Sequence, residues 1–83
     1  MKWAVYIIET SDNSYYTGIT TDIQRRFNEH LTGKGAKFFN TCQPITVLYQ
    51  ESGHTRSSAS KREAEIKSMT HLEKKKLIAS KSK

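Results

Sequence analysis

Residues 3–20 read WAVYIIET-SDNS-YYTGIT, and this stretch decides the first half of the fold. Its first eight residues are mostly apolar, aromatic or β-branched, which predicts a buried strand. The next four, SDNS, are turn formers, and strand character resumes at Tyr15 and continues to Thr20. We expect a β-hairpin, whose two strands are antiparallel because the connection between them is short.

An amphipathic helix is expected next, over residues 22–32. Thr21 and Gln24 have the spacing of a capping box, with Thr21 as the N-cap. Apolar residues then recur at four-residue intervals, as on the buried side of a helix, at Ile23, Phe27 and Leu31. Gly33 is expected to end this helix.

The second half of the chain predicts one more strand and two helices. Residues 45–49 carry the strand signal and residues 52–55 that of a turn. A long helix is expected to run as far as Met69. A second capping box at residues 70–73 opens a short last helix through Ile78, followed by a polar, frayed tail.

The expected fold is α/β, with a small three-stranded sheet flanked by helices in the order β-β-α-β-α-α. The direction of the third strand is left open, so the sheet is mixed or antiparallel. Eighty-three residues are enough for one hydrophobic core, and we expect a single domain over residues 1–83.

The charge of the chain favours a polyanionic partner. The formal net charge is +6, which suits nucleic acid or an anionic membrane surface, although a lysine-rich tail supplies much of the surplus. Cys42 is the only cysteine, so no internal disulfide and no cysteine-cluster metal site is possible. No apolar run approaches the ~20 residues of a membrane helix. We expect a cytoplasmic location.

Two polar residues on the first helix are candidates for phosphate chemistry. Arg26 and His30 lie at the edge of the apolar stripe, whereas Arg25 falls on the solvent side. A guanidinium at that edge can hold a phosphate through two parallel hydrogen bonds, and an imidazole can orient a phosphate or relay a proton. The alternatives are an arginine whose stem covers the core edge and an ordinary helix-end histidine.

Glu63 is the candidate metal ligand. It falls on the apolar side of the long helix, in the sector marked by Ala59, Ile66 and Met69. An inward carboxylate is costly unless it is paired or binds a metal. Lys67, four residues on, offers a plain ion pair, which is the alternative. Mg²⁺ keeps several waters and needs few protein carboxylates, so one glutamate can suffice, and no spacing implies a second metal.

Tyr6 and Tyr16 lie on the two strands of the hairpin and are expected to approach each other if the register pairs their faces. A nearby cation would favour the phenolate and make it a usable base. The alternative is two aromatic residues packed in the core. Gly18, on the same face as Tyr16, indicates a close approach of backbone or ligand.

Lys34 and Lys37 flank Gly35 in a short basic loop after the first helix, which can track a nucleic-acid backbone. The alternative is a solvated loop that caps the helix. The spacing is not that of a phosphate-binding Walker loop.

As a set, these residues resemble the GIY-YIG nuclease superfamily, in particular its short stand-alone bacterial members, and are similar to the N-terminal domain of the repair nuclease UvrC. The two half-motifs appear as Ala4-Val5-Tyr6 and Tyr16-Thr17-Gly18. The helix arginine and histidine match Arg26 and His30 in IQRRFNEH, and the metal-binding glutamate matches Glu63 in KREAEIK. The loop GKGAK at 33–37 looks like that of the short members.

The resemblance implies hydrolysis of DNA with one divalent ion, Mg²⁺ or Mn²⁺. Tyr6 would be the general base, Tyr16 would orient water or phosphate, Arg26 would stabilise the pentacovalent charge and Glu63 would hold the metal. Arg26, Lys34, Lys37 and Lys67 are the expected nucleic-acid contacts. We expect a monomer, with a protein partner as one route to specificity and DNA repair or recombination as the setting.

Three departures from the family pattern matter. Ala4 replaces the first glycine, and no asparagine follows Glu63. Phe38-Phe39-Asn40 stands where short relatives carry a tyrosine, a threonine and an arginine, which removes a hydroxyl and a cation near the expected site. The alternative function is therefore a non-catalytic nucleic-acid-binding module or an accessory interaction subunit with the same fold.

Overall fold

The computed structural model describes residues 2–33 and 42–81, and the basic loop with Lys34 and Lys37 and the segment 38–40 lie outside the described residues. The elements are β1 (Trp3–Thr10), β2 (Tyr15–Thr20), α1 (Ile23–Leu31), β3 (Pro44–His54), α2 (Arg56–Lys67) and α3 (His71–Lys81). The expected order β-β-α-β-α-α is confirmed, and so is the α/β class.

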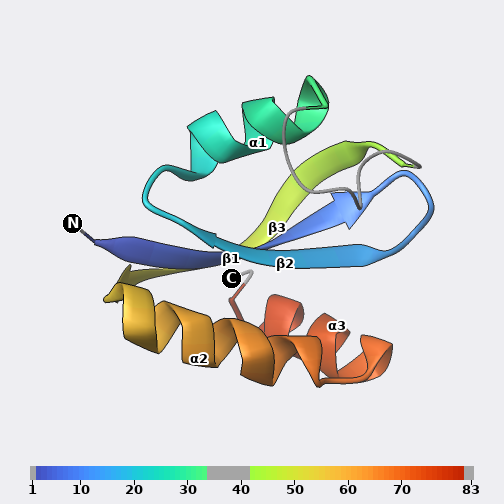
Figure 1. Ribbon diagram of the computed structural model, residues 1–83. Helices are drawn as coiled ribbons and strands as arrows, with labels where there is room; N and C mark the ends of the chain where they lie inside the picture. Colours follow the sequence, from blue (N-terminus) through green and yellow to red (C-terminus); the bar gives the residue numbers. More distant parts are fainter. Residues whose placement is uncertain (1, 34–41, 82–83) are drawn as a thin grey trace.

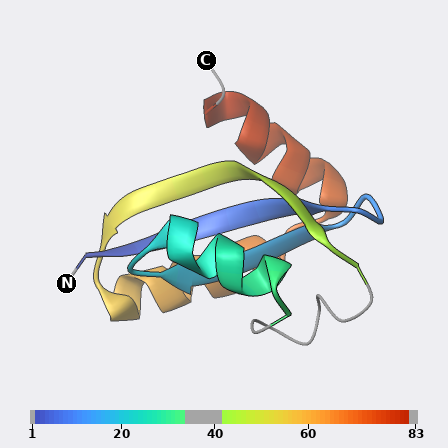
Figure 2. The ribbon, with the colours of Figure 1, turned by 90° about the horizontal axis from the view of Figure 1, so that it is seen from above.

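The three strands form an antiparallel sheet in the order β2-β1-β3. The third strand is therefore antiparallel to β1, which resolves the direction that the sequence left open. The hairpin register pairs Tyr6 with Gly18 and Ile8 with Tyr16, so both tyrosines lie on one face of the sheet. Helix α1 covers that face, and α2 and α3 cover the other (Figure 1). Figure 2 shows β2 and β3 at the two edges of the sheet, with β1 between them.

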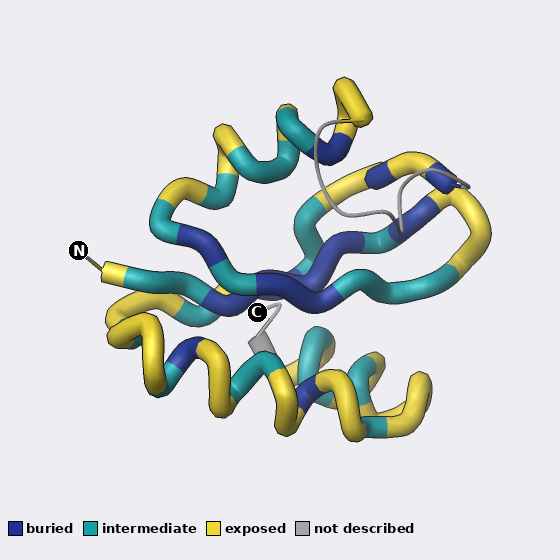
Figure 3. Tube along the Cα trace, viewed as in Figure 1, coloured by how far each residue is buried: buried dark blue, intermediate teal, exposed yellow. Residues whose placement is uncertain are grey.

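The core consists of two layers, one on each face of β1. Val5 and Ile7 are fully buried against Ala59 and Ile66 of α2, with residues of α3 packed around them. Tyr6 and Ile8 point to the opposite face, beneath the apolar side of α1. Burial in Figure 3 follows this plan, because the central strand is dark along most of its length while the outer sides of the helices are exposed. The alternation along β1 therefore presents Tyr6 to α1.

The first helix differs from its prediction at both ends. Asp22, not Thr21, is the N-cap, because the Asp22 side chain accepts a hydrogen bond from the backbone N–H of Arg25. The helix spans residues 23–31, and the expected buried Leu31 is 50 % exposed. His30 is buried in its place, at 2 % exposure. His30, expected at the edge of the apolar stripe, is therefore a core residue.

The later elements are also longer or shorter than expected. Strand β3 runs through the expected turn to His54, and α2 ends at Lys67, before Met69. Helix α3 continues to Lys81 instead of fraying after Ile78. The second capping box is confirmed, because the Thr70 backbone N–H donates to Glu73 and the Glu73 N–H donates to the Thr70 hydroxyl. No helix in the described part of the chain is long and apolar enough to cross a membrane.

Candidate active site at the β2 edge of the sheet

Gly18 makes room for the Tyr6 side chain above the edge strand β2. A Cβ atom at position 18 would lie 2.5 Å from the Tyr6 hydroxyl oxygen and 2.7 Å from Cζ of the same ring. Both separations are far below van der Waals contact, so only glycine allows the ring to lie across this strand. The close approach at Gly18 is made by a side chain, the Tyr6 ring, where the sequence suggested backbone or ligand. It places the phenol hydroxyl over the outermost strand.

Tyr6, Tyr16 and His30 form one aromatic cluster on the α1 side of the sheet. The Tyr6 hydroxyl lies 3.0 Å from His30 Nε2, a hydrogen bond whose direction depends on the imidazole tautomer. The Tyr16 ring meets the His30 ring edge-on with centroids 5.2 Å apart, and the Tyr6 and Tyr16 centroids are 6.3 Å apart. The hairpin therefore brings the two tyrosines together, as expected, and α1 adds the histidine to them.

The surroundings of Tyr6 combine burial with charges of both signs. The pKa of Tyr6 is raised to about 12, chiefly by burial and to a smaller extent by Tyr16 and the Glu63 carboxylate, against the lowering effect of the Arg26 guanidinium. Tyr6 thus interacts with Arg26 from α1 and with Glu63 from α2, two helices on opposite faces of the sheet. The phenol is neutral at pH 7.

His30 is held neutral as well. Burial lowers the pKa of the imidazole below its ordinary value of 6.5, and the Arg26 cation lowers it further. A neutral imidazole has one ring nitrogen that can accept a proton. With Nε2 beside the Tyr6 hydroxyl, the pair is arranged so that a proton can pass between them.

Arg26 reaches the site from the edge of α1 and is about one-third exposed, with Nη1 bound to Glu29 Oε1 at 2.9 Å. That ion pair raises the pKa of the guanidinium, which stays charged at every accessible pH. The partner Glu29 stands three residues on in the same helix, a spacing that the sequence contains and that we had not interpreted. Because the pair is partly solvated, a phosphate can compete with Glu29 for this arginine.

Glu63 projects from α2 and is a quarter exposed, with its Oε2 atom 3.3 Å from Lys67 Nζ. The ion pair offered as the alternative is thus present. The carboxylate remains accessible to solvent, and its charge is one of the smaller influences that raise the pKa of Tyr6. An accessible carboxylate fits a Mg²⁺ or Mn²⁺ ion held by one glutamate, waters and substrate phosphate. Within residues 2–33 and 42–81, no group of three or more His, Cys, Asp or Glu side chains could hold a metal. A cage made of protein ligands alone is therefore absent from the described residues.

Four of the five residues expected to be catalytic, Tyr6, Tyr16, Arg26 and His30, lie together on the α1 face of the sheet. Glu63 stands on α2, which covers the other face, and its charge acts on Tyr6 only weakly. The expected nucleic-acid contacts are only partly described. Lys67 lies at the site, beside Glu63, and 55 % of its side chain is exposed. Lys34 and Lys37 fall outside the described residues. An apolar hollow of about 440 Å³ opens between α1 and β3, and none of the five predicted catalytic residues lines it.

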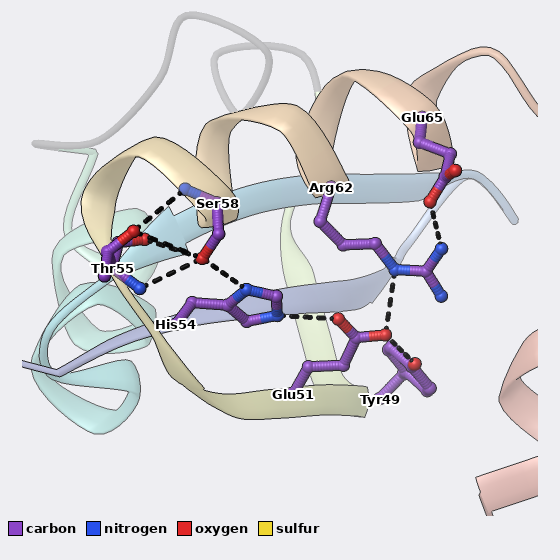
Figure 4. Close-up of polar contacts among 7 residues, drawn as sticks. All are labelled: Tyr49, Glu51, His54, Thr55, Ser58, Arg62 and Glu65. Atoms are coloured by element: carbon purple, nitrogen blue, oxygen red, sulfur yellow. Dashed lines mark hydrogen bonds and ion pairs between the residues drawn. The ribbon is translucent and has the colours of Figure 1, made fainter.

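A second polar cluster, on the α2 side of the sheet, escaped the sequence analysis (Figure 4). Glu51 of β3 accepts hydrogen bonds from the Tyr49 hydroxyl and from Arg62 Nε of α2, and it contacts His54. The signal in the sequence was the alternation of Tyr49 and Glu51, which places both on one face of a strand that we had ended at residue 49. This cluster joins α2 to the edge strand β3.

Comparison with known proteins places the chain in a family. The sequence model of the GIY-YIG catalytic domain matches residues 2–76. The chain therefore belongs to the GIY-YIG nuclease family, which confirms the resemblance seen in its motifs.

Relatives of similar size occur in bacteria and archaea. A UPF0213 protein of Cupriavidus necator is 48 % identical over 77 residues, which cover 93 % of this chain and 84 % of that protein. A UPF0213 protein of Halobacterium salinarum is 47 % identical over 74 residues, covering 89 % and 96 % of the two chains. The solution structure of the UPF0213 protein BH0048 from Bacillus halodurans has a TM-score of 0.63 and 36 % identity, and it covers 98 % of this chain and 86 % of its own.

Proposed function

We propose that this protein is a divalent-metal-dependent endonuclease that hydrolyses DNA phosphodiester bonds. The observation that carries the proposal is the Tyr6 hydroxyl, which lies over Gly18 of the edge strand β2, 3.0 Å from His30 Nε2, with the Arg26 cation beside it. A neutral proton-transfer pair, a phosphate-binding cation and a metal-binding acid are the groups that phosphodiester hydrolysis requires. Membership of the GIY-YIG nuclease family supports the same conclusion.

Tyr6 and His30 form the proton path in this proposal. A phenol with a pKa of about 12 cannot serve as a base at pH 7 until its own proton leaves. His30 Nε2, 3.0 Å away and on a neutral ring, is the acceptor. As Tyr6 takes a proton from the attacking water, its hydroxyl proton passes to Nε2, and the resulting hydroxide attacks phosphorus. Tyr16, packed against both rings, orients the water or the phosphate.

Arg26 and Glu63 act on the phosphate from the two sides of the sheet. Arg26 exchanges Glu29 for a phosphate oxygen and stabilises the charge that builds up on the pentacovalent phosphorus. Glu63 would hold Mg²⁺ or Mn²⁺. That ion, when bound, would neutralise charge on the scissile phosphate and its leaving oxygen. Lys67 then loses its glutamate partner and is free to contact the DNA backbone.

In this proposal the protein binds DNA mainly through its positive charge. A net charge of +6 favours phosphate contacts, and Lys34, Lys37 and Lys67 are the proposed ones beside Arg26. We propose that residues 1–83 form one domain and that the protein is a cytoplasmic monomer, which binds DNA weakly alone and gains specificity from a partner. Repair or recombination is the proposed setting.

A non-catalytic nucleic-acid-binding module is the second candidate. Phe38-Phe39-Asn40 favours it, because these residues replace a hydroxyl and a cation expected near the site. Such a module, or an accessory subunit of a larger nuclease, would keep the basic charge and lose the chemistry.

Cleavage assays on branched, nicked and linear DNA separate the two candidates. We expect the parent to cleave at least one substrate in Mg²⁺ or Mn²⁺, and Glu63→Gln and Tyr6→Phe to lose about 100-fold or more of that rate. Glu65→Gln, an exposed carboxylate on the same helix, is the matched control and should cleave as the parent does. Salt-sensitive binding that survives Glu63→Gln, with no cleavage in either metal, would establish the binding module instead.

A further inference from the structure

The apolar contact that docks α2 on the sheet is narrow. Of its residues 56–67, only Ala59 and Ile66 are buried, and the two are seven positions apart. Residues at this spacing form a single line along a helix. Apolar contacts along one such line hold the helix against the sheet, but they resist rotation of the helix about its own axis only weakly. Polar contacts must therefore set the rotation of α2.

Arg62 and Glu63 stand on opposite sides of this line. On a helical wheel, Arg62 lies about 60° to one side of Ala59 and Glu63 about 40° to the other. Arg62 reaches toward β3, where it binds Glu51, whereas Glu63 lies on the other side of the line and pairs with Lys67. Any rotation that moves Arg62 away from Glu51 also moves the Glu63 carboxylate relative to Tyr6.

Glu51 is a firm anchor for Arg62. Its side chain is 17 % exposed, its Oε2 atom accepts from Arg62 Nε at 2.9 Å, and its Oε1 atom lies 2.9 Å from His54 Nε2 (Figure 4). The Tyr49 hydroxyl donates to it as well. Burial alone would raise the pKa of Glu51, but the bonds from Tyr49, His54 and Arg62 hold it below its ordinary range. The anchor is therefore charged at neutral pH.

We propose that Glu51 is a positioning residue for Glu63, which acts through Arg62 by fixing the rotation of α2. The inference rests on the proposed role of Glu63. Side chains on a helix lie about 5–6 Å from its axis, so a rotation of about 10° displaces the carboxylate by about 1 Å. A displacement of that size at a reacting centre lowers the rate by up to about 100-fold. Glu51 itself lies on the far edge strand and touches no reacting group.

The test measures steady-state DNA cleavage by Glu51→Gln, which keeps the size of the side chain and removes its charge. We expect kcat to fall at least about tenfold while KM for DNA stays within about twofold, because the basic residues that contact DNA are unchanged. Glu65→Gln removes the other, 61 % exposed partner of Arg62 and should keep the parental kcat. Leu77→Ala, which removes apolar packing from α3 and leaves every polar group of the Glu51 cluster in place, controls for lost stability.

A double-mutant cycle shows whether Glu51 acts through Glu63. In a Glu63→Gln background, Glu51→Gln should lower the residual rate by less than about twofold, because the carboxylate that it positions is gone. An equal loss in both backgrounds, or a parental kcat in the single Glu51→Gln variant, would overturn the positioning role. If Glu63→Gln cleaves as well as the parent, the proposed function fails and this inference falls with it.

Discussion

The fit of Tyr6 over Gly18 makes Gly18→Ala the most informative single change. The new Cβ would meet the Tyr6 hydroxyl oxygen at 2.5 Å, so the ring must move by roughly 1 Å to reach ordinary contact. Overpacking of this kind lowers the free energy of unfolding by about 1–3 kcal/mol. Alanine also restricts the unfolded chain more than glycine does, which raises the free energy of unfolding by about 0.4–1 kcal/mol. We expect a net loss of about 1–2 kcal/mol, which lowers Tm by about 4–16 °C in a domain of this size.

The same displacement should disable the site. A shift of the ring by that much is incompatible with the present 3.0 Å geometry between the Tyr6 hydroxyl and His30 Nε2. Cleavage should therefore fall about 100-fold, far more than the loss of folded protein explains. Thermal unfolding by circular dichroism and a cleavage assay at about 25 °C measure the two effects separately.

The Tyr6→Ala background provides the control. Without the phenol ring, a Cβ atom at position 18 meets only Tyr16 Cε2, at 3.2 Å, and the Tyr16 ring can move into the space that Tyr6 leaves. Gly18→Ala should therefore be close to neutral there. The two substitutions should thus couple by at least about 1 kcal/mol. Equal destabilisation in both backgrounds would refute the argument that Gly18 exists to accommodate Tyr6.

Individual contacts support three more predictions. Burial raises the pKa of Tyr6 to about 12, so the folded state favours the neutral phenol. The resulting contribution to folding stability is fully present below pH 10 and is lost as the pH rises from 10 through about 12. The difference in tyrosinate absorbance between the parent and Tyr6→Phe will show the titration of Tyr6 in this range. Glu29→Gln removes the ion-pair partner of Arg26 and should tighten DNA binding about 1.5- to 5-fold at low salt. Fluorescence anisotropy measures the affinity, and an unchanged value would argue against a phosphate contact at Arg26. Thr55→Ala removes the N-cap of α2 and should cost about 1 kcal/mol of unfolding free energy in urea, whereas no loss would contradict the capping box.

The sequence predicts the hairpin and the second capping box well because both depend on local chemistry. Side chains alternate in direction along β1 and β2, and the turn residues SDNS join the two strands. These two facts suffice to place Tyr6 and Tyr16 on one face of the sheet. The pairing of Glu63 with Lys67 is likewise local, since residues four apart are neighbours on a helix.

The buried side of α1 shows where such reasoning fails. Each step of four residues rotates the side-chain direction by about 40° about the helix axis. After two such steps Leu31 points well away from the direction of Ile23, and it is half exposed. Residues seven apart on a helix point within about 20° of each other. His30 therefore lies in line with Ile23 and inside the core. The expectation favoured leucine because it is apolar, whereas the helix geometry and the hydrogen bond to Tyr6 favour histidine.

The sequence alternation places Tyr49 and Glu51 on one face of a strand, but it does not show which face that is or that Arg62 meets them there. The register of β1 with β3 shifts between Ile7, which pairs with Tyr49, and Ile8, which pairs with Val47. Leu48 is the extra residue between these partners. This bulge places Tyr49 and Glu51 on the α2 face. Eleven residues separate Glu51 from Arg62, and only the packed sheet brings them together.

The central claim is that Glu63 holds a divalent metal beside the Tyr6 hydroxyl, and paramagnetic NMR tests it most directly. Titration with Mn²⁺ should broaden the resonances of Glu63 and Tyr6 before all others, and Glu63→Gln should abolish the effect while Glu65→Gln leaves it intact. Broadening that begins elsewhere on the chain, or that persists in Glu63→Gln, would contradict the account.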